Sequence, residues 1–428
     1  MNPVLGASVL LGLFATFALL RVPIAFSLFA AAVLAFLLNG DFTMWVLAQR
    51  LYSGIDNVAL LAIPGFVFTG AVMGRGGMAK HLIHSMRTIV GHIPGGLAVV
   101  AVLACAMFAA ISGSSPATVA AVGGTVIPGM IANGYDRKYA MGLVAAAATL
   151  GILIPPSIPM ILFGVTANVS IGQLFMAGVV PGIFLTVVLI VYAILHARAS
   201  GYGRLPRSSW SERWQAGRKA IWGLLFPVIV LGSIYGGVAT PSETAAISSA
   251  YAIIISLFVY REMSLDDWRA TLRETVVVTA MIFMIIAGAK LFGFYLVQMR
   301  IPGLVTDWVF DANITVATFF VFVCILFLVL GTFLEAASII LITLPVLFPI
   351  VLALGINPLH FAIVMTVCME LAQITPPVGL NLFVVSGIMK ARMGEVIRGV
   401  APFVLVMIAV LIVLTLLPGI SVWLPSTM

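Results

Sequence analysis

The chain has 428 residues, of which 62% are hydrophobic and 8% are charged, and its formal net charge is +7. A soluble chain of this size needs roughly a quarter of its residues charged to cover its surface. The composition therefore excludes a soluble globular protein and predicts a membrane protein whose surface is largely covered by lipid.

Apolar runs of the kind that cross a bilayer, about 20 residues each, follow one another along the chain. The continuous runs lie at about 4–20, 23–39, 59–77, 139–165, 174–196, 220–238, 243–260, 275–297, 359–388 and 399–423. Two further runs, 98–132 and 315–353, are interrupted halfway by GSSP and by TFLEAAS. The first run has neither the basic region nor the cleavage pattern of a signal peptide, so we expect it to be a retained span.

Basic residues are concentrated in alternate loops. We place the N-terminus outside, let each continuous run cross once and let each interrupted run return to its own side. The inside loops then hold 18 of the 21 Lys and Arg residues: Arg21; Arg75, Lys80 and Arg87; Arg137 and Lys138; the six of 198–219; Arg261, Arg269 and Arg273; Lys390, Arg392 and Arg398. Because cytoplasmic loops carry an excess of Lys and Arg, both termini are predicted to be periplasmic. The same bias explains the net positive charge, so we expect no nucleic-acid partner.

The chain resembles itself when it is shifted by 221 residues. The coinciding positions are Pro128 with Pro349, Gly134 with Gly355, Pro155 with Pro376, Pro156 with Pro377, Gly178 with Gly399 and Pro181 with Pro402. A shift of 218 aligns Pro23 with Pro241 and Gly70 with Gly288. This self-similarity predicts a duplication, with one repeat at 1–219 and the other at 220–428.

Equivalent loops of the two repeats differ in charge. NGYDRKY (133–139) is basic where its counterpart GINPLH (355–360) is not, whereas IMKARMG (388–394) is basic where ANVSIG (167–172) is neutral. Equivalent loops should therefore face opposite sides of the membrane, as in the inverted repeats of secondary transporters. The predicted fold is all-α, with two inverted repeats. Each has scaffold helices, a re-entrant helical hairpin (98–132 or 315–353) and a broken helix (139–165 or 359–388).

Four breaks in the apolar runs occupy corresponding places in the two halves. They are ISGSSPAT (111–118), GILIPPSIP (151–159), GTFLEAAS (331–338) and AQITPPVGL (372–380). A Pro pair removes two backbone donors and frees carbonyl groups, and such a break is tolerated only inside protein or beside a water-filled cavity. Freed carbonyls and hydroxyls suit a hard cation such as sodium, and helix N-termini suit a carboxylate. The alternative is that each Pro only kinks a helix and each Ser bonds to its own backbone; the repeat-equivalent positions favour a binding site.

Four charged residues lie within or near the apolar runs, where charge is costly: Glu243, Glu335, Glu370 and Lys290. A functional interpretation places Glu335 at the tip of the second hairpin and Glu370 beside the second broken helix. The alternative is that each side chain only bonds to nearby backbone. Glu243 begins a span, as a carboxylate at a helix start does.

Four segments together resemble one known family: AAISGSSPATVAAVG, LGILIPPSIPMILFG, GGVATPSETAA and ITPPVGLNLF. The chain resembles, over nearly its whole length, the large membrane subunit of tripartite ATP-independent periplasmic (TRAP) transporters of the DctM/SiaM type. The resemblance implies a sodium-coupled elevator transporter of the ion-transporter superfamily in the bacterial inner membrane. It also implies two partners, a small four-helix membrane subunit, encoded separately here, and a soluble periplasmic binding protein. The family carries dicarboxylates, sialic acids, other sugar acids and keto acids.

The resemblance also implies two or more coupling sodium ions and assigns their ligands. The first sodium site would use the side chains of Ser112 and Ser115 and the backbone of Gly151, Ile154 and Pro156. The second would use Gly331, Ala372, Thr375 and Val378, with Ala372 standing where the family commonly has Gly. Substrate contacts are expected from four residues of the same segments: Ser114, Pro156, Pro377 and Asn381.

Two other functions remain open at this point. One is a self-sufficient anion transporter of the same superfamily, which needs no binding protein. The other is an intramembrane enzyme with a Ser of GSSP as its nucleophile. Such a Ser usually needs a His base, and the histidines all lie at loops or span ends: His81, His84, His92, His196 and His360. We therefore expect no enzyme activity.

Overall fold

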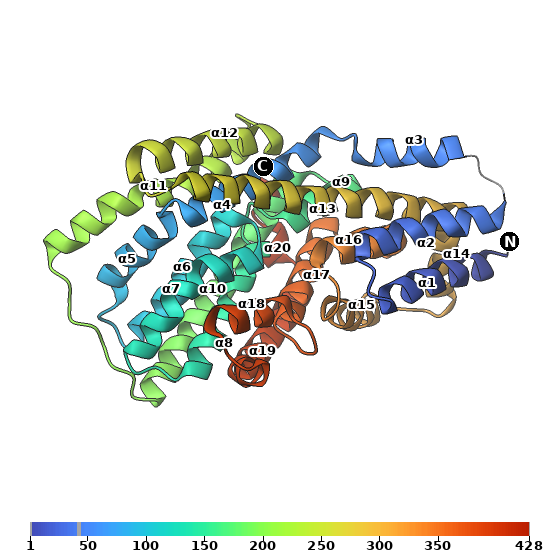
Figure 1. Ribbon diagram of the computed structural model, residues 1–428. Helices are drawn as coiled ribbons and strands as arrows, with labels where there is room; N and C mark the ends of the chain where they lie inside the picture. Colours follow the sequence, from blue (N-terminus) through green and yellow to red (C-terminus); the bar gives the residue numbers. More distant parts are fainter. Residues whose placement is uncertain (1, 41–43, 428) are drawn as a thin grey trace.

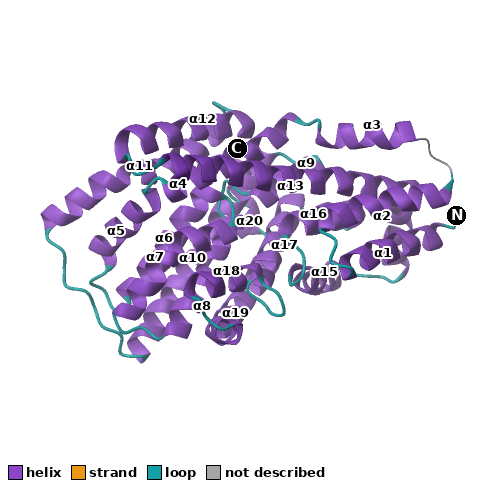
Figure 2. Ribbon diagram, viewed as in Figure 1, coloured by secondary structure: helices purple, strands orange, loops and turns teal. Residues whose placement is uncertain are grey.

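A computed structural model describes residues 2–40 and 44–427 of the chain, and all regular structure in these two ranges is helical (Figure 2). The helices of the first half are α1 (Pro3–Leu19), α2 (Ile24–Asn39), α3 (Met44–Ile55), η1 (Val58–Leu61), α4 (Ala62–Arg75), α5 (Met78–Val90), α6 (Gly96–Ser112), α7 (Ser115–Ala132), α8 (Arg137–Ala147), η2 (Ala148–Ile152), α9 (Ile158–Ala167) and α10 (Ile171–Ala199). Those of the second half are α11 (Trp210–Tyr235), α12 (Pro241–Ile254), η3 (Ile255–Tyr260), α13 (Leu265–Gln298), α14 (Ile301–Asp311), α15 (Val316–Gly331), α16 (Ala336–Ala353), α17 (Pro358–Gln373), α18 (Leu380–Met389), α19 (Met393–Leu416), α20 (Gly419–Val422) and η4 (Pro425–Thr427).

The predicted apolar runs all become helices. Eight helices in the described part of the chain are long and apolar enough to cross a membrane, and shorter apolar helices fill the remaining runs. The interrupted runs become the hairpins α6–α7 and α15–α16. The runs 139–165 and 359–388 are broken at 153–157 and 374–379, and in each gap the bond between the two prolines is cis. The prediction of an all-helical membrane protein with broken segments is confirmed.

Local sequence signals explain where several long helices begin. The backbone N–H and the hydroxyl of Thr240 both donate to Glu243 Oε2 at 2.8 Å, while the Glu243 N–H donates to the Thr240 hydroxyl. This reciprocal cap starts α12, and the same arrangement starts α11 and α13. It satisfies backbone donors that have no partner inside a helix. Glu243 is therefore a helix-start carboxylate, as its position in the sequence indicated.

Three amphipathic helices were not anticipated from the apolar runs: α3, α5 and α14. Each is short and has polar residues on one face, so the mean hydropathy of its segment stays low. In addition, α11 starts at Trp210, so residue 219 lies inside that helix. The joint between the two halves is the irregular segment 200–209.

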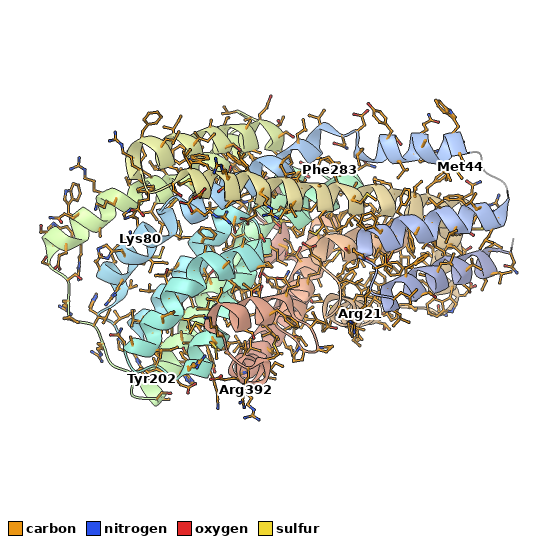
Figure 3. The ribbon with its side chains drawn as sticks, in the orientation of Figure 1. Arg21, Met44, Lys80, Tyr202, Phe283 and Arg392 are labelled. Carbon is orange, nitrogen blue, oxygen red and sulfur yellow. The ribbon has the colours of Figure 1, made fainter. Side chains whose placement is uncertain are left out.

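The long helix α13 runs along most of the molecule (Figure 1) and packs against α2, α4 and α16. The side chains of Lys80 on α5 and Met44 at the start of α3 lie near opposite ends of this long axis (Figure 3). The hairpins and broken helices lie together: α7 packs on α18, and α16 packs on α9. Each hairpin thus contacts the broken helix of the other half of the chain, which brings the four interrupted segments to one region.

Candidate functional site

The tip of the first hairpin is a two-residue turn between α6 and α7. Gly113 there has a φ of +61°, and a Cβ on it would lie 2.6 Å from the carbonyl oxygen of Pro156. A Cβ on Gly151 would likewise lie 2.6 Å from the carbonyl oxygen of Ser114. Only glycine, which has no Cβ, permits both approaches. The tip is therefore pressed directly against the first broken helix.

Oxygen atoms gather at this tip. The Ser112 hydroxyl lies 3.0 Å from the Thr118 hydroxyl and donates to the Ser114 carbonyl oxygen at 3.2 Å, and Thr118 donates to the same carbonyl at 2.8 Å. Ser112 and Thr118 are both buried. Hydroxyl and carbonyl oxygens are the ligands that hard cations prefer. Thr118 was not among the predicted ligands, because it stands one turn inside α7 and only the folded turn brings it back to Ser112.

Asn381 joins the tip to the second half of the chain. Its side-chain amide donates to Ser115 Oγ at 2.7 Å and to the Ala145 carbonyl oxygen at 2.9 Å, and Ser115 Oγ lies 3.0 Å from its Oδ1. Asn381 and Ser115 are both fully buried. The structure therefore places Asn381 behind the hairpin tip as a bridge between α18, α7 and α8.

Of the remaining residues of the first predicted sodium site, Gly151 and Pro156 touch the tip and the side chain of Ile154 does not. The backbone of Gly151 and Pro156 touches the turn, as described above. The side chain of Ile154 faces away, because a Cβ on Gly182 of α10 would lie 2.6 Å from its Cγ1. The first set of predicted backbone ligands is thus brought together with Ser112, with Ile154 at its outer edge.

The second predicted sodium site is built differently. Gly331 at the end of α15 faces Ala372, and a Cβ on Gly331 would lie 2.5 Å from the Ala372 methyl. The Thr375 hydroxyl donates to the Leu371 carbonyl oxygen at 2.6 Å. Val378 lies in the irregular gap that follows, and Pro377 is exposed. Hairpin and broken helix meet here too, through a glycine and an alanine.

A cavity of about 300 Å³ opens between the hairpin tips and the helices α4 and α13. Both tips and both broken helices contribute to its lining: Ser112, Gly113, Ser114, Ser115, Pro116, Ala117, Ile152, Ile158, Pro159, Glu335, Ala336, Ala337, Gln373 and Leu380. Residues of α4 and α13, including Arg75 and Glu274, complete the lining. The volume is at the lower end of the range for small-molecule pockets, about 300 to 1,000 Å³.

Two helices begin at the cavity wall. Ser114 and Glu335 occupy the N-cap positions of α7 and α16, and neither side chain caps its own helix. The first N–H groups of both helices and the positive ends of their dipoles therefore lie beside the cavity. Helix N-termini of this kind bind anions.

The other charged residues of the apolar runs lie elsewhere. Glu370 on α17 is completely buried, and neither of its oxygens has a partner in the described part of the chain. The stem of Lys290 packs against Gly54 of α3. Glu335 is thus the one residue of the original four that lines the cavity.

Metal-ligating residues and histidine near the cavity bear on what chemistry its serines could do. No group of three His, Cys, Asp or Glu that could hold a metal ion occurs within residues 2–40 and 44–427. No histidine is among the described residues that line the cavity, so the serines of the tip have no imidazole base there. The lining can hold ions and a polar ligand through hydroxyls, carbonyls and helix ends.

Comparisons with known proteins identify the family and the fold. Residues 11–420 match the family described as "Tripartite ATP-independent periplasmic transporter, DctM component". The chain is 44% identical over 400 residues to the C4-dicarboxylate TRAP transporter large permease protein DctM of Pseudomonas aeruginosa, with 94% of each chain covered. It is 41% identical to the protein of that name from Rhodobacter capsulatus, covering 99% of both, and 34% identical to the sialic acid TRAP transporter large permease protein SiaM of Vibrio cholerae, covering 94% and 95%.

A solved structure shares the fold at low sequence identity. The Alcanivorax borkumensis YdaH transporter superposes with a TM-score of 0.62 at 14% identity, covering 95% of this chain and 97% of that one. At this identity the likeness concerns the fold alone.

Proposed function

The chain belongs to the DctM family of large membrane subunits of TRAP transporters, and we propose that it imports C4-dicarboxylates by sodium-coupled secondary transport. The resemblance seen in the sequence motifs is thereby confirmed at the level of the family. The substrate class is inferred from relatives at 41 to 44% identity whose names state C4-dicarboxylates. A chain of this family is a transporter permease and not an enzyme.

The observation that carries the proposal is the composition of the cavity wall. Hydroxyl oxygens and two helix N-termini meet there from segments more than 200 residues apart. An anion needs positive helix ends and donors, while coupling cations need oxygens, and both are within one site. Binding at the meeting point of two halves is the arrangement expected of secondary transporters.

The sodium proposal is supported by the first hairpin above all. The Ser112 and Thr118 hydroxyls and the Ser114 carbonyl form a compact group of oxygens without a carboxylate. A proton carrier needs a titratable group, whereas sodium needs only oxygen ligands. The second site would rely on carbonyl groups around Gly331 and Ala372 and on Thr375.

Two inverted repeats moving as an elevator are part of the same proposal. The element boundaries recur at the offset found in the sequence: α7 begins at Ser115 and α16 at Ala336, while α8 begins at Arg137 and α17 at Pro358. Each hairpin also packs on the broken helix of the other half, α7 on α18 and α16 on α9. Such reciprocal contacts are what a two-fold relation between halves produces.

A small membrane subunit and a periplasmic binding protein complete the proposed transporter. The family is tripartite, and no segment of irregular or polar sequence in this chain is long enough to form a domain that captures substrate. The alternative of a self-sufficient transporter makes the opposite prediction for the isolated subunit.

The test is uptake of radiolabelled succinate into proteoliposomes that contain this chain with its small subunit and its binding protein. We expect uptake with an inward sodium gradient and none with choline and a proton gradient. Full uptake without sodium would contradict the cation assignment and direct attention to Glu335 and Glu370. Uptake by this chain alone would support the self-sufficient alternative.

The orientation in the inner membrane is proposed from the basic loops and is tested by labelling. Cysteine replaces exposed Ser426 or a residue of the irregular segment 200–209, such as Ser208, in a chain without its native cysteines. A membrane-impermeant thiol reagent should reach position 426 from the periplasm and should not reach position 208. Labelling of position 208 in intact cells would reverse the orientation.

A further inference from the structure

The part of the cavity wall formed by α4 and α13 carries an ion pair that the proposed function does not yet use. Arg75, in the last turn of α4, places its guanidinium Nη1 2.6 Å from Oε2 of Glu274 on α13. Both side chains line the cavity, and they are 34% and 41% exposed, so the pair is accessible and not sealed in the protein. α4 and α13 pack on each other, as Figure 1 shows.

Arg75 is the one cationic side chain among the described residues of the cavity lining, where the other charged residues are Glu274 and Glu335. An arginine presents a planar fork of donors that matches a carboxylate in bidentate fashion. The ligand at present engaged by that fork is a carboxylate of the protein itself. A carboxylate of a bound organic acid has the same chemistry and could take its place.

Glu274 also lies near two other arginines, Arg269 and Arg273. It also lines an adjacent recess together with Arg269, Ala270, Arg273 and Val277. Arg269 is paired with Asp266 at 3.3 Å, and Arg273 directly precedes Glu274 on α13. A Glu274 side chain released from Arg75 therefore stays beside positive charge, which keeps the exchange of partners from isolating a carboxylate near the membrane interior.

We propose that Arg75 recognises one carboxylate of the transported acid and that Glu274 is its exchangeable internal counter-ion. The second carboxylate of the acid lies at the N-terminus of α7, apart from the Glu335 carboxylate that starts α16. The cavity is thus built for an anion with two charged ends, and a monoanion of equal length leaves one of the two positions unused. This inference rests on the proposed function and specifies which part of the site selects the charge of its substrate.

The experiment measures binding to the chain purified with its small membrane subunit in lipid nanodiscs at saturating sodium. The ligands are succinate and butyrate, which have the same number of carbons and differ by one carboxylate. Affinity is read from the ligand-dependent shift of the thermal unfolding midpoint. The variants are Arg75→Gln, Arg75→Lys and Glu274→Gln, with Lys80→Gln as the control, because Lys80 pairs with Glu262 and lines neither the main cavity nor the adjacent recess.

We expect Arg75→Gln to weaken succinate binding by about tenfold or more, the usual size for a lost charge-assisted contact. Butyrate binding should change by less than about threefold, because a monoanion already has the N-terminus of α7. Arg75→Lys should recover part of the loss, since a lysine keeps the charge without the fork. Glu274→Gln should strengthen succinate binding, because the competing carboxylate is gone.

If Arg75 recognises the substrate, Arg75→Gln lowers succinate affinity and Glu274→Gln raises it. If the ion pair is only structural, both substitutions destabilise the protein and lower succinate affinity. Equal changes of succinate affinity in the same direction for Arg75→Gln and Glu274→Gln would overturn the role of Arg75. A loss of affinity with Lys80→Gln as large as with Arg75→Gln would overturn it too. If Arg75→Gln prefers succinate over butyrate as strongly as the wild type does, and the wild type binds succinate normally, this inference is refuted and the proposed function stands. Failure of the wild type to bind or import any organic anion refutes the proposed function and this inference with it.

Discussion

The two hairpin tips stand at equivalent places in the two halves but differ in length and chemistry, since residues 113–114 separate the helices of the first and residues 332–335 those of the second. At the offset of 221 residues, Ser112, Ser114, Ser115 and Thr118 of the first tip correspond to Phe333, Glu335, Ala336 and Ile339 of the second. Four hydroxyls are thus replaced by three apolar side chains and one carboxylate. Under the proposed function, the cation would therefore be held through side chains in the first half and through backbone carbonyls in the second.

The tips also differ in how firmly they are held. Asn381 of α18 bonds to Ser115 and to the backbone of α8 behind the first tip, and the position equivalent to Asn381 in the first half is Met160. The prolines of the first gap are buried, whereas Pro376 and Pro377 are exposed. The first tip is therefore held by side-chain hydrogen bonds from α18, whereas at the second tip Gly331 packs against Ala372.

The largest effect is expected from adding a methyl group at the two glycines that let each tip approach its broken helix. In Gly151→Ala the new Cβ meets the backbone of Ser114 at 2.6 Å, and in Gly331→Ala it meets the Ala372 methyl at 2.5 Å. Overpacking of this kind costs about 1 to 3 kcal/mol, so transport should fall by roughly tenfold to a hundredfold in both variants, measured as initial uptake rates in proteoliposomes.

A compensating substitution should restore transport at the second tip and not at the first. Adding Ala372→Gly to Gly331→Ala returns the lost space, so uptake should recover. No single side chain can compensate Gly151→Ala, because the clash is with backbone. Gly129→Ala on α7, where a Cβ meets open space, is the control and should transport normally. If the double variant Gly331→Ala/Ala372→Gly does not regain uptake, Gly331 has a role beyond allowing the close approach to Ala372.

A smaller effect is expected from removing the bridge that only the first tip has. Asn381→Ala leaves Ser115 and the Ala145 carbonyl without their partner, which should lower the free energy of unfolding by about 2 kcal/mol. The measurement is the thermal unfolding midpoint of the purified membrane complex. Ser386→Ala on the same helix, whose hydroxyl donates only to the Ala391 carbonyl oxygen, should lower it much less. Equal losses would show that Asn381 has no special bridging role.

The sequence alone indicates much of this architecture, because composition and apolar runs report directly on lipid exposure. The breaks at 113–114 and 332–335 follow from GSSP and TFLEAAS. The resemblance to the family singled out Gly151 and Gly331 as cation ligands, and only the structure shows their close approach to neighbouring segments. The bridge from Asn381 to Ser115 joins residues 266 apart, and no local pattern records such a pair. The pair of Arg75 and Glu274 was missed for the same reason, since Arg75 was counted only among the basic residues of the loops and Glu274 lies just before the apolar run 275–297.

The smallest effect is expected from deleting one hydroxyl at each proposed cation site. Thr118→Val and Thr375→Val keep the shape of the side chain and remove its oxygen. The Thr118 hydroxyl belongs to the oxygen group at the first tip, whereas the Thr375 hydroxyl donates back to the Leu371 carbonyl one turn earlier. Ser115→Ala is less clean for this purpose, because it also frees Asn381.

Loss of one oxygen ligand should raise the sodium concentration for half-maximal uptake by about twofold to tenfold, in line with a contact of 0.5 to 1.5 kcal/mol. We expect Thr118→Val near the upper end of that range and Thr375→Val near the lower end, since carbonyls supply most of the second site. The readout is succinate uptake against sodium concentration, with the maximal rate and the unfolding midpoint as controls for folding. If Thr375→Val proves the more damaging of the two, the side-chain chemistry of coupling lies in the second half, and the contrast drawn between the tips is reversed. A sodium dependence that neither variant alters would place the coupling ions away from both hydroxyls and leave the carbonyl groups at the two breaks as their ligands.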